Sequence, residues 1–355
     1  MKRATVQLGD FLTLKRGYDL PGHARVPGEV PVVSSSGVTG THREAKVDGP
    51  GVVTGRYGTL GEVFYIDEPF WPLNTALYVQ DFKGNHRRFV SYFLKWILSG
   101  TQSDKAAVPG VNRNDLHARK VEVPEDPSEQ AAIASILTTY DDLIENNRRR
   151  IQLLEQSVRL LYKEWFVHLR FPGHEHVRVV DGVPEGWEKK SLGELVTLQR
   201  GFDLPVGERQ EGYIPIYAST GINGHHIEAK VKGPGVVTGR SGSLGKVMYV
   251  PGDFWPLNTT LWVKEFKLTG PLFTTHLLIS MQLQQYNGGA AVPTLNRNDV
   301  HRVDVLLPPP MLLQLFEDQA EDIARQIDLL NRMITKLEYA RNLLLPRLMN
   351  EGVLV

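Results

Sequence analysis

The sequence predicts an α+β protein: two tandem, repeated α+β domains separated by two long helices that form an antiparallel coiled coil. Two observations carry this prediction. Phrases of the first half return in the second half at a constant offset of 184 residues, and each copy is followed by a long heptad pattern. A duplicated unit with its own helix predicts a pseudo-twofold axis through the helix pair, with the domains at opposite ends.

The repeat is clearest in a glycine-rich phrase, GPGVVTGRYGTLGEVFYI at 49–66, which returns as GPGVVTGRSGSLGKVMYV at 233–250. Three further phrases, which begin at Leu8, Phe70 and Ala106, return beginning at Leu192, Phe254 and Ala290. The offset is 184 each time, so roughly a hundred residues repeat without an insertion or deletion. The repeats of solenoid proteins are shorter, at about 20–50 residues. The chain is therefore one domain duplicated.

The glycine-rich phrase itself predicts two strands joined by a turn. Residues 52–53 and 63–66 are apolar runs, and glycines punctuate the segment between them. A phosphate-binding loop is the alternative, but Arg240 stands where that motif needs glycine. Glu62 also replaces Lys246 in the first copy and would repel a phosphate. The strand–turn–strand interpretation is therefore favoured.

Each copy is followed by a stretch that the heptad pattern predicts to be helical. Apolar residues alternate in steps of four and three from Ile133 to Trp165, with one polar position, Asn147. The pattern returns at an offset of 183 from Phe316 to Leu348, with Arg341 as its charged exception. Two such seams in one chain bury each other most simply as an antiparallel pair. The residues expected to pair are Ile144, Ile151 and Leu154 in the first helix and Ile327, Ile334 and Leu337 in the second.

The domain bounds follow from these patterns. The sequence predicts a first domain at 1–128, a long helix at 129–166, a connector at 167–190, a second domain at 191–310 and a second long helix at 311–350. Short β-forming runs bounded by glycine and proline dominate each domain. One apolar segment per copy, at 87–100 and 272–285, predicts a helix. The connector is expected to be loop and short turns.

Composition excludes several classes of protein. The chain has no cysteine, which removes disulfides, thiolate zinc sites and cysteine nucleophiles. Forty basic residues balance forty acidic ones, so DNA binding would need local patches rather than a global positive field. Nothing in the sequence resembles a signal peptide or a membrane span. A cytoplasmic location without a membrane partner is expected.

The sequence carries no recognisable catalytic motif and no predicted metal site. His174 and His176 flank Glu175, but further ligands at suitable spacing are missing. The pair Asp141-Asp142 and the arginines at 148–150 lie on the first long helix, where charges usually form a solvated face. The motifs of serine hydrolases, zinc peptidases, amino-methylating enzymes and nucleases do not occur. We therefore expect a chain without chemistry of its own.

Taken together, these features resemble the specificity subunit of Type I restriction–modification systems. The order of two repeated domains, each followed by a long helix, is the same. VPEGWEKKSLGELVTLQRG at 183–201 resembles the start of a target recognition domain in that family. RNDLHARKVEVPEDPSEQAAIASIL at 113–137 and RNDVHRVDVLLPPP at 297–310 resemble its end. The resemblance covers the whole chain.

The resemblance implies a subunit without a cofactor of its own. Each target recognition domain would read one half of a split double-stranded DNA sequence, and the helices would fix the gap between the halves. Two modification subunits would dock on the helices and methylate adenines with their own S-adenosylmethionine, and restriction subunits would join to translocate and cut DNA. Two alternatives remain: a structural adaptor that binds no nucleic acid, and a specificity subunit of a related, non-restricting phage-defence methylation complex.

The duplication sorts the candidate DNA-binding residues into two groups. Positions shared by the copies cannot distinguish two half-sites, so they are expected to contact phosphates or support the scaffold. They are Arg56, Asn112, Arg113, Arg240, Asn296 and Arg297. The candidate base readers come from segments that differ between the copies. They are Ser34, Ser35, Ser36, Thr39, His42, Arg43, Tyr57, Thr59 and Lys105 in the first copy, and Thr220, Asn223, His225, His226, Ser241 and Ser243 in the second.

Overall fold

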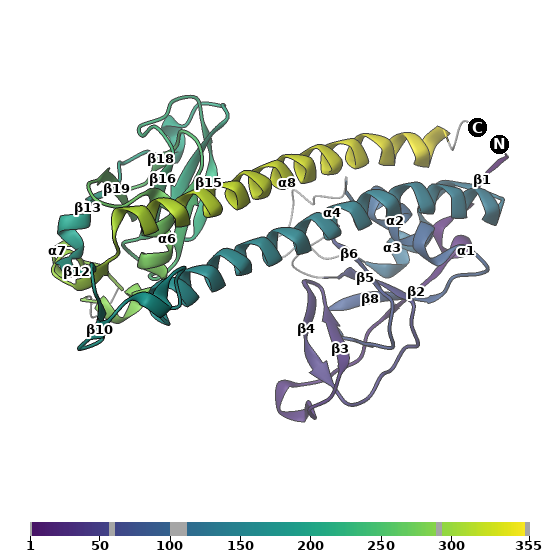
Figure 1. Ribbon diagram of the computed structural model, residues 1–355. Helices are drawn as coiled ribbons and strands as arrows, with labels where there is room; N and C mark the ends of the chain where they lie inside the picture. Colours follow the sequence, from purple (N-terminus) through teal and green to yellow (C-terminus); the bar gives the residue numbers. More distant parts are fainter. Residues whose placement is uncertain (1, 57–60, 100–111, 289–292, 352–355) are drawn as a thin grey trace. The chain divides into compact units, whose positions relative to one another are not determined.

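The computed structural model describes residues 2–56, 61–99, 112–288 and 293–351 (Figure 1). The chain divides into two compact units: Met1–Asn146 with Met333–Val355 form unit 1, and Asn147–Arg332 forms unit 2. Two long helices, α4 (Pro127–Tyr162) and α8 (Pro310–Glu351), each contribute one part to each unit. Each unit therefore contains one domain and a part of both long helices.

The domain of unit 1 is built on two sheets. A four-stranded antiparallel sheet has the order β2 (Thr13–Arg16), β8 (Ala76–Asp81), β5 (Gly51–Gly55), β6 (Val63–Ile66). A three-stranded sheet has the order β4 (Gly37–His42), β3 (Val30–Ser34), β7 (Trp71–Pro72). The strands β1 (Arg3–Gln7) and β9 (Lys120–Pro124) pair separately, and the helices are α1 (Leu8–Phe11), α2 (Arg87–Leu98) and α3 (Arg113–Ala118).

Unit 2 repeats this topology element by element. Its four-stranded sheet has the order β13 (Val196–Arg200), β19 (Thr260–Phe266), β16 (Gly235–Gly239), β17 (Val247–Val250). Its three-stranded sheet has the order β15 (Gly221–His226), β14 (Ile214–Ala218), β18 (Trp255–Pro256). The strands β12 (Glu188–Ser191) and β20 (Asp304–Leu307) pair, and the helices are α5 (Leu192–Leu195), α6 (Pro271–Ser280) and α7 (Arg297–His301). The predicted duplication and the α+β class are confirmed.

The predicted strand–turn–strand element is also confirmed in both copies, as β5–β6 and β16–β17. Strand β5 is buried along its whole length because both faces are covered. Val52 packs with α2 and the long helices, whereas Val53 packs on the other face with Val33 and Phe70. Successive side chains of a strand point to opposite faces, so one short apolar run serves two cores.

The long helices complete the core of each unit. In unit 1, Ile133 and Leu137 of α4 pack with Phe89 and Phe93 of α2 and with Leu348 near the end of α8. In unit 2, the partners are reversed: the end of α4 packs against the beginning of α8. There, the fully buried Phe316 meets the rings of Tyr162, Trp165, Phe166 and Phe273. The two helices therefore run antiparallel within each unit.

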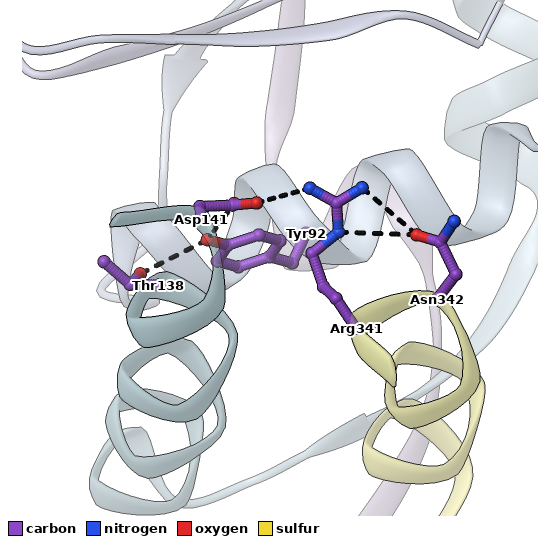
Figure 2. Close-up of polar contacts among 5 residues, drawn as sticks. All are labelled: Tyr92, Thr138, Asp141, Arg341 and Asn342. Atoms are coloured by element: carbon purple, nitrogen blue, oxygen red, sulfur yellow. Dashed lines mark hydrogen bonds and ion pairs between the residues drawn. The ribbon is translucent and has the colours of Figure 1, made fainter. Parts of the chain in front are cut away.

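Burial along the predicted helix seam is uneven. Ile144 and the polar Asn147 are buried. The other residues predicted to pair are half-buried: Ile151, Leu154, Ile327, Ile334 and Leu337. Asp141 departs from expectation, because it does not lie on a solvated face. It accepts a hydrogen bond from the Tyr92 hydroxyl at 2.6 Å and forms an ion pair with Arg341, the charged exception of the second seam (Figure 2).

This contact links three elements of unit 1: α2 through Tyr92, α4 through Asp141 and α8 through Arg341. The Arg341 guanidinium also donates to Asn342 Oδ1, and the Tyr92 hydroxyl lies 3.3 Å from Thr138 Oγ1 (Figure 2). Burial and the neighbouring Asp141 raise the pKa of Tyr92, which keeps its hydroxyl protonated as a donor.

Within the described ranges, no helix is long and apolar enough to cross a membrane.

Candidate nucleic-acid interface

In unit 2, three segments that differ between the copies lie side by side. The β14–β15 turn is joined to the β16–β17 segment by Lys246, whose Nζ donates to the carbonyl oxygen of Thr220 at 2.6 Å. The third segment, which follows α6, approaches the β16–β17 turn. A Cβ at Gly245 would lie 2.4 Å from Oε1 of Gln284, and the N–H of Gly242 donates to Pro293 O at 3.0 Å. These three contacts join residues that are 26, 39 and 51 positions apart in sequence.

The backbone of the β16–β17 turn is fixed from several sides. The N–H groups of Arg240 and Ser241 both donate to Thr259 O, at 2.8 and 3.1 Å. The carbonyl of Arg240 accepts from the Leu295 N–H at 2.8 Å. Arg240 is therefore held by its backbone, while its side chain stays half-buried at the surface. The turn therefore fixes the point from which the Arg240 side chain leaves the backbone, which favours a reproducible contact with another molecule.

Unit 1 brings the corresponding segments together. A Cβ at Gly37, in the β3–β4 turn, would lie 3.1 Å from the Phe64 ring of β6. A Cβ at Gly61 would lie 3.3 Å from Leu98 O, at the end of α2. Arg56 repeats the backbone contact of Arg240, since its N–H donates to Thr75 O at 3.0 Å. Three candidate readers, Tyr57, Thr59 and Lys105, lie outside the described residues.

Most of the remaining candidate readers can be reached from solvent. The exposed ones are Ser36, Thr39, Arg43, Thr220, Asn223, His225 and Ser243, and Ser35 and Ser241 are half-buried. Their side chains are mostly hydroxyls, amides and imidazoles, which can donate to and accept from base edges. Ser35, Ser36 and Thr220 lie in the turns of the two three-stranded sheets, and Ser241 and Ser243 lie in the β16–β17 turn. Thr39 lies on β4, Asn223 and His225 lie on β15, and Arg43 directly follows β4.

His42 and His226 do not fit the expectation that they contact bases. Both are only 5% exposed, and each Nδ1 accepts a backbone N–H at 3.0 Å, from Val26 and Gln210 respectively. Their rings pack edge-on against Trp71 and Trp255. A buried ring that holds a neighbouring loop cannot reach a base, so both residues leave the set of candidate readers.

Ser34 also leaves the set of candidate readers because it is buried. It is 8% exposed, and its hydroxyl donates to Gly37 O while it accepts from the N–H of Ser36. These contacts lie within the β3–β4 turn. Ser34 therefore shapes the turn, whereas Ser36 stands exposed on it.

For the shared asparagines, the sequence left two roles open: contact with phosphates or support of the scaffold. The structure shows that both asparagines cap helices. Asn112 caps α3 and Asn296 caps α7, and each side-chain oxygen accepts the N–H two residues later, at 2.9 and 3.0 Å. Arg113 and Arg297 follow them and are exposed. The caps support the scaffold alternative for the asparagines and leave the arginines available to a ligand.

One shared pair was missed in the sequence. His117 Nε2 accepts the Leu14 N–H, and His301 Nε2 accepts the Leu198 N–H, both at 2.9 Å. Burial, and then the nearby Arg113 or Arg297, lowers the pKa of each imidazole and keeps it a neutral acceptor. The constant offset that relates them was visible in the sequence, but their partners are backbone groups about a hundred residues away. The part of the chain described by the structure contains no cluster of three side chains that could hold a metal.

Comparison with known proteins gives consistent results. The family model of the type I restriction modification DNA specificity domain matches residues 2–156 and 184–339. The Type I restriction enzyme MjaIX specificity subunit of Methanocaldococcus jannaschii is 27% identical over 259 residues, or 65% of this chain and 60% of that protein. The MjaVIII specificity subunit of the same organism is 29% identical over 118 residues, or 32% of this chain and 27% of that protein. The chain thus spans about 60% of the length of the first of these relatives.

A solved structure shares the fold. The crystal structure of the S subunit of a Type-I restriction-modification system from M. genitalium matches with a TM-score of 0.63 and 17% identity, over 99% of this chain and 97% of that one. The two family matches coincide with the two copies seen in the sequence and the structure. The chain therefore belongs to the family of type I restriction modification DNA specificity domains.

Proposed function

We propose that this chain is the specificity subunit of a cytoplasmic Type I restriction–modification complex and that each domain reads one half of a split double-stranded DNA sequence. One observation carries the proposal: a backbone frame repeated with the same hydrogen bonds presents different exposed side chains on its converging turns. Two readers of different half-sites need this combination of a constant scaffold and variable contacts. We also propose that the two reading domains span residues 1–128 and 191–310.

The shared arginines are proposed to anchor the DNA backbone. Arg56 and Arg240 occupy the same place in the two turns, and a guanidinium suits a phosphate. Arg56→Ala should weaken binding to all sequences alike and reduce the salt dependence by about one phosphate contact. A variant that changes the preferred sequence instead would identify a base contact. Tyr57→Ser should, in contrast, change the preference of the first half-site only, by about 1–3 kcal/mol.

The long helices are proposed to carry two modification subunits, which hold the S-adenosylmethionine and the catalytic groups. Both helices expose large apolar side chains, among them Leu160 on α4 and Leu343 on α8, each 51% exposed. These two leucines are equivalent under the helix offset of 183. Leu160→Asp and Leu343→Asp should each remove one modification subunit, as native mass spectrometry would show. Restriction subunits are proposed to join this complex.

The decisive test is selection of bound DNA from a randomised pool, with the modification subunits present. A split motif with a fixed gap is expected. Absence of selection would favour the structural adaptor. The isolated chain should transfer no methyl group from labelled S-adenosylmethionine and should not cut DNA, and either activity would contradict the proposal. A non-restricting methylation complex stays the second candidate, and DNA cleavage by the assembled complex separates the two.

A further inference from the structure

One position on the converging turns reverses its charge between the copies. Glu62 and Lys246 are equivalent, and both precede the second strand of the strand–turn–strand element. Their backbones are held alike: Thr54 Oγ1 donates to Glu62 O at 2.9 Å, and Thr238 Oγ1 donates to Lys246 O at 3.0 Å. The glycine before each has a φ of +86°. Side chains of opposite charge therefore leave the same backbone frame at the same point.

Lys246 lies where the segments of the interface meet. Its side chain is exposed, and one of its ammonium donors is bonded to Thr220 O, in the β14–β15 turn. An ammonium has three donors, so this contact fixes its direction without using its full capacity. Glu62 is exposed in the corresponding place of unit 1, next to Gly61, which lies against the end of α2. Lys246 thus contacts a candidate reader directly, and Glu62 leaves the equivalent backbone position in unit 1.

The chemistry of the two side chains selects different base edges. A carboxylate close to DNA is repelled by phosphates, so Glu62 is favourable at such an edge only opposite a donor. The donor that Glu pairs with in the major groove is the N4 amino group of cytosine, whereas Lys pairs with O6 and N7 of guanine. We propose that Glu62 selects cytosine in the first half-site and Lys246 selects guanine in the second. This inference rests on the proposed function and deepens it.

The test exchanges the two charges in the full chain, assembled with the modification subunits. Selection from a randomised pool should give the wild-type complex a cytosine at one position of the first half-site and a guanine at one position of the second. Glu62→Lys should replace that cytosine by guanine and leave the second half-site unchanged. Lys246→Glu should produce the reciprocal change in the second half-site alone. Each exchange should alter the relative affinity for the two bases about tenfold or more, as expected for a good base contact.

Two control variants make the outcome decisive. Glu122→Lys makes the same charge change on the exposed face of β9, away from the turns, and should leave the selected motif unchanged. Glu62→Met keeps a side chain of similar length but removes the carboxylate acceptors, so a loss of cytosine preference with intact complex assembly is expected and would support the proposal. If Glu62→Lys strengthens binding to all sequences equally and steepens the salt dependence, position 62 faces phosphates and the inference is overturned. A wild-type complex that selects no split motif would instead overturn the proposed function itself.

Discussion

The two units follow one backbone plan, yet they join their domain to the long helices with different chemistry. Unit 1 uses a polar link, in which Tyr92 donates to Asp141 and Asp141 pairs with Arg341 (Figure 2). The offsets of 184 in the domains and 183 in the helices place His276, Ala324 and Val158 at these three positions in unit 2. There the same region is an aromatic cluster, in which the His276 ring stacks on Tyr162 with a centroid separation of 5.7 Å.

The difference shows which parts of the duplicated domain are constrained. Several contacts that hold backbone recur in both copies, such as His117 with Leu14 and His301 with Leu198. The side chains between domain and helices have changed together, because a charged member of the polar link is unfavourable without its partner. An aromatic cluster needs no such matching, since its stabilisation is mostly apolar burial. The comparison predicts different sensitivities to substitution in the two units.

The largest effect is expected from Phe316→Ala in unit 2. Phe316 is fully buried, and its removal leaves a cavity among several aromatic rings. The loss of unfolding free energy should be about 3–5 kcal/mol. Hydrogen exchange followed peptide by peptide should show the loss in unit 2 segments. The matched control is Ile133→Ala, the equivalent and equally buried position of unit 1, whose effect should fall on unit 1 segments. Equal losses in both units for either variant would contradict the expectation that each residue stabilises mainly its own unit.

The polar link of unit 1 should respond differently to partial and complete removal. Asp141→Ala deprives Arg341 and Tyr92 of their acceptor, and we expect a loss of about 1–3 kcal/mol, because the pair is only partly buried. The triple variant Tyr92→Phe, Asp141→Ala, Arg341→Val imitates the apolar solution of unit 2 and should recover most of this loss. Urea unfolding of the single and triple variants measures the difference. A triple variant less stable than Asp141→Ala would show that the link contributes net stability.

Acid should weaken unit 2 through His276. Burial, assisted by Arg159, lowers the pKa of His276 to about 4 from an ordinary value of about 6.5. The neutral ring is favoured in the folded state, so stability is full above pH 6.5 and falls as the pH decreases towards 4. At about pH 5 the loss should be about 2 kcal/mol. His117 and His301 also have lowered pKa values, but one lies in each unit.

The measurement for His276 is the difference in unfolding free energy between pH 7 and pH 5. His276→Phe keeps an aromatic ring in the cluster and removes the titration, so its pH dependence should be smaller by the stated amount. Tyr92→Phe is the control in unit 1 and should leave the pH dependence between 5 and 7 unchanged, since Tyr92 stays protonated throughout. The same pH dependence in wild type and His276→Phe would assign the acid effect to another group.

Much of the fold could be predicted from the sequence because duplication acts as an internal comparison. The constant offset defined the repeated domain, and the heptad steps defined two helices that the structure shows as α4 and α8. Arg341 was already visible as an exception in its seam. Its partner was not, because Asp141 lies 200 residues away and only the antiparallel contact of the helices brings them together.

The interface was predicted less completely. The loops that converge were identified from their differences between the copies, but the solvent exposure of single residues was not predictable. His42 and Ser34 lie in a polar segment that differs between the copies, yet both are buried, and their side chains form hydrogen bonds with nearby backbone groups. Whether a polar side chain faces solvent or holds its own turn depends on backbone geometry, which residue type alone does not determine. The capping roles of Asn112 and Asn296 depend on backbone geometry in the same way.

The smallest effect, and one that should be equal in both units, is expected at these caps. Asn112→Ala and Asn296→Ala each remove an acceptor for the N–H of the second helical residue, and each should lower the unfolding free energy of its unit by about 1 kcal/mol. Asn112→Asp and Asn296→Asp keep the cap and should retain the stability. They also add a negative charge, which would weaken DNA binding if these side chains contacted phosphates. Stability from urea unfolding and affinity at two salt concentrations therefore separate the roles. Unchanged affinity in the aspartate variants supports a purely structural cap, whereas a loss confined to DNA binding would return both asparagines to the phosphate-contacting group.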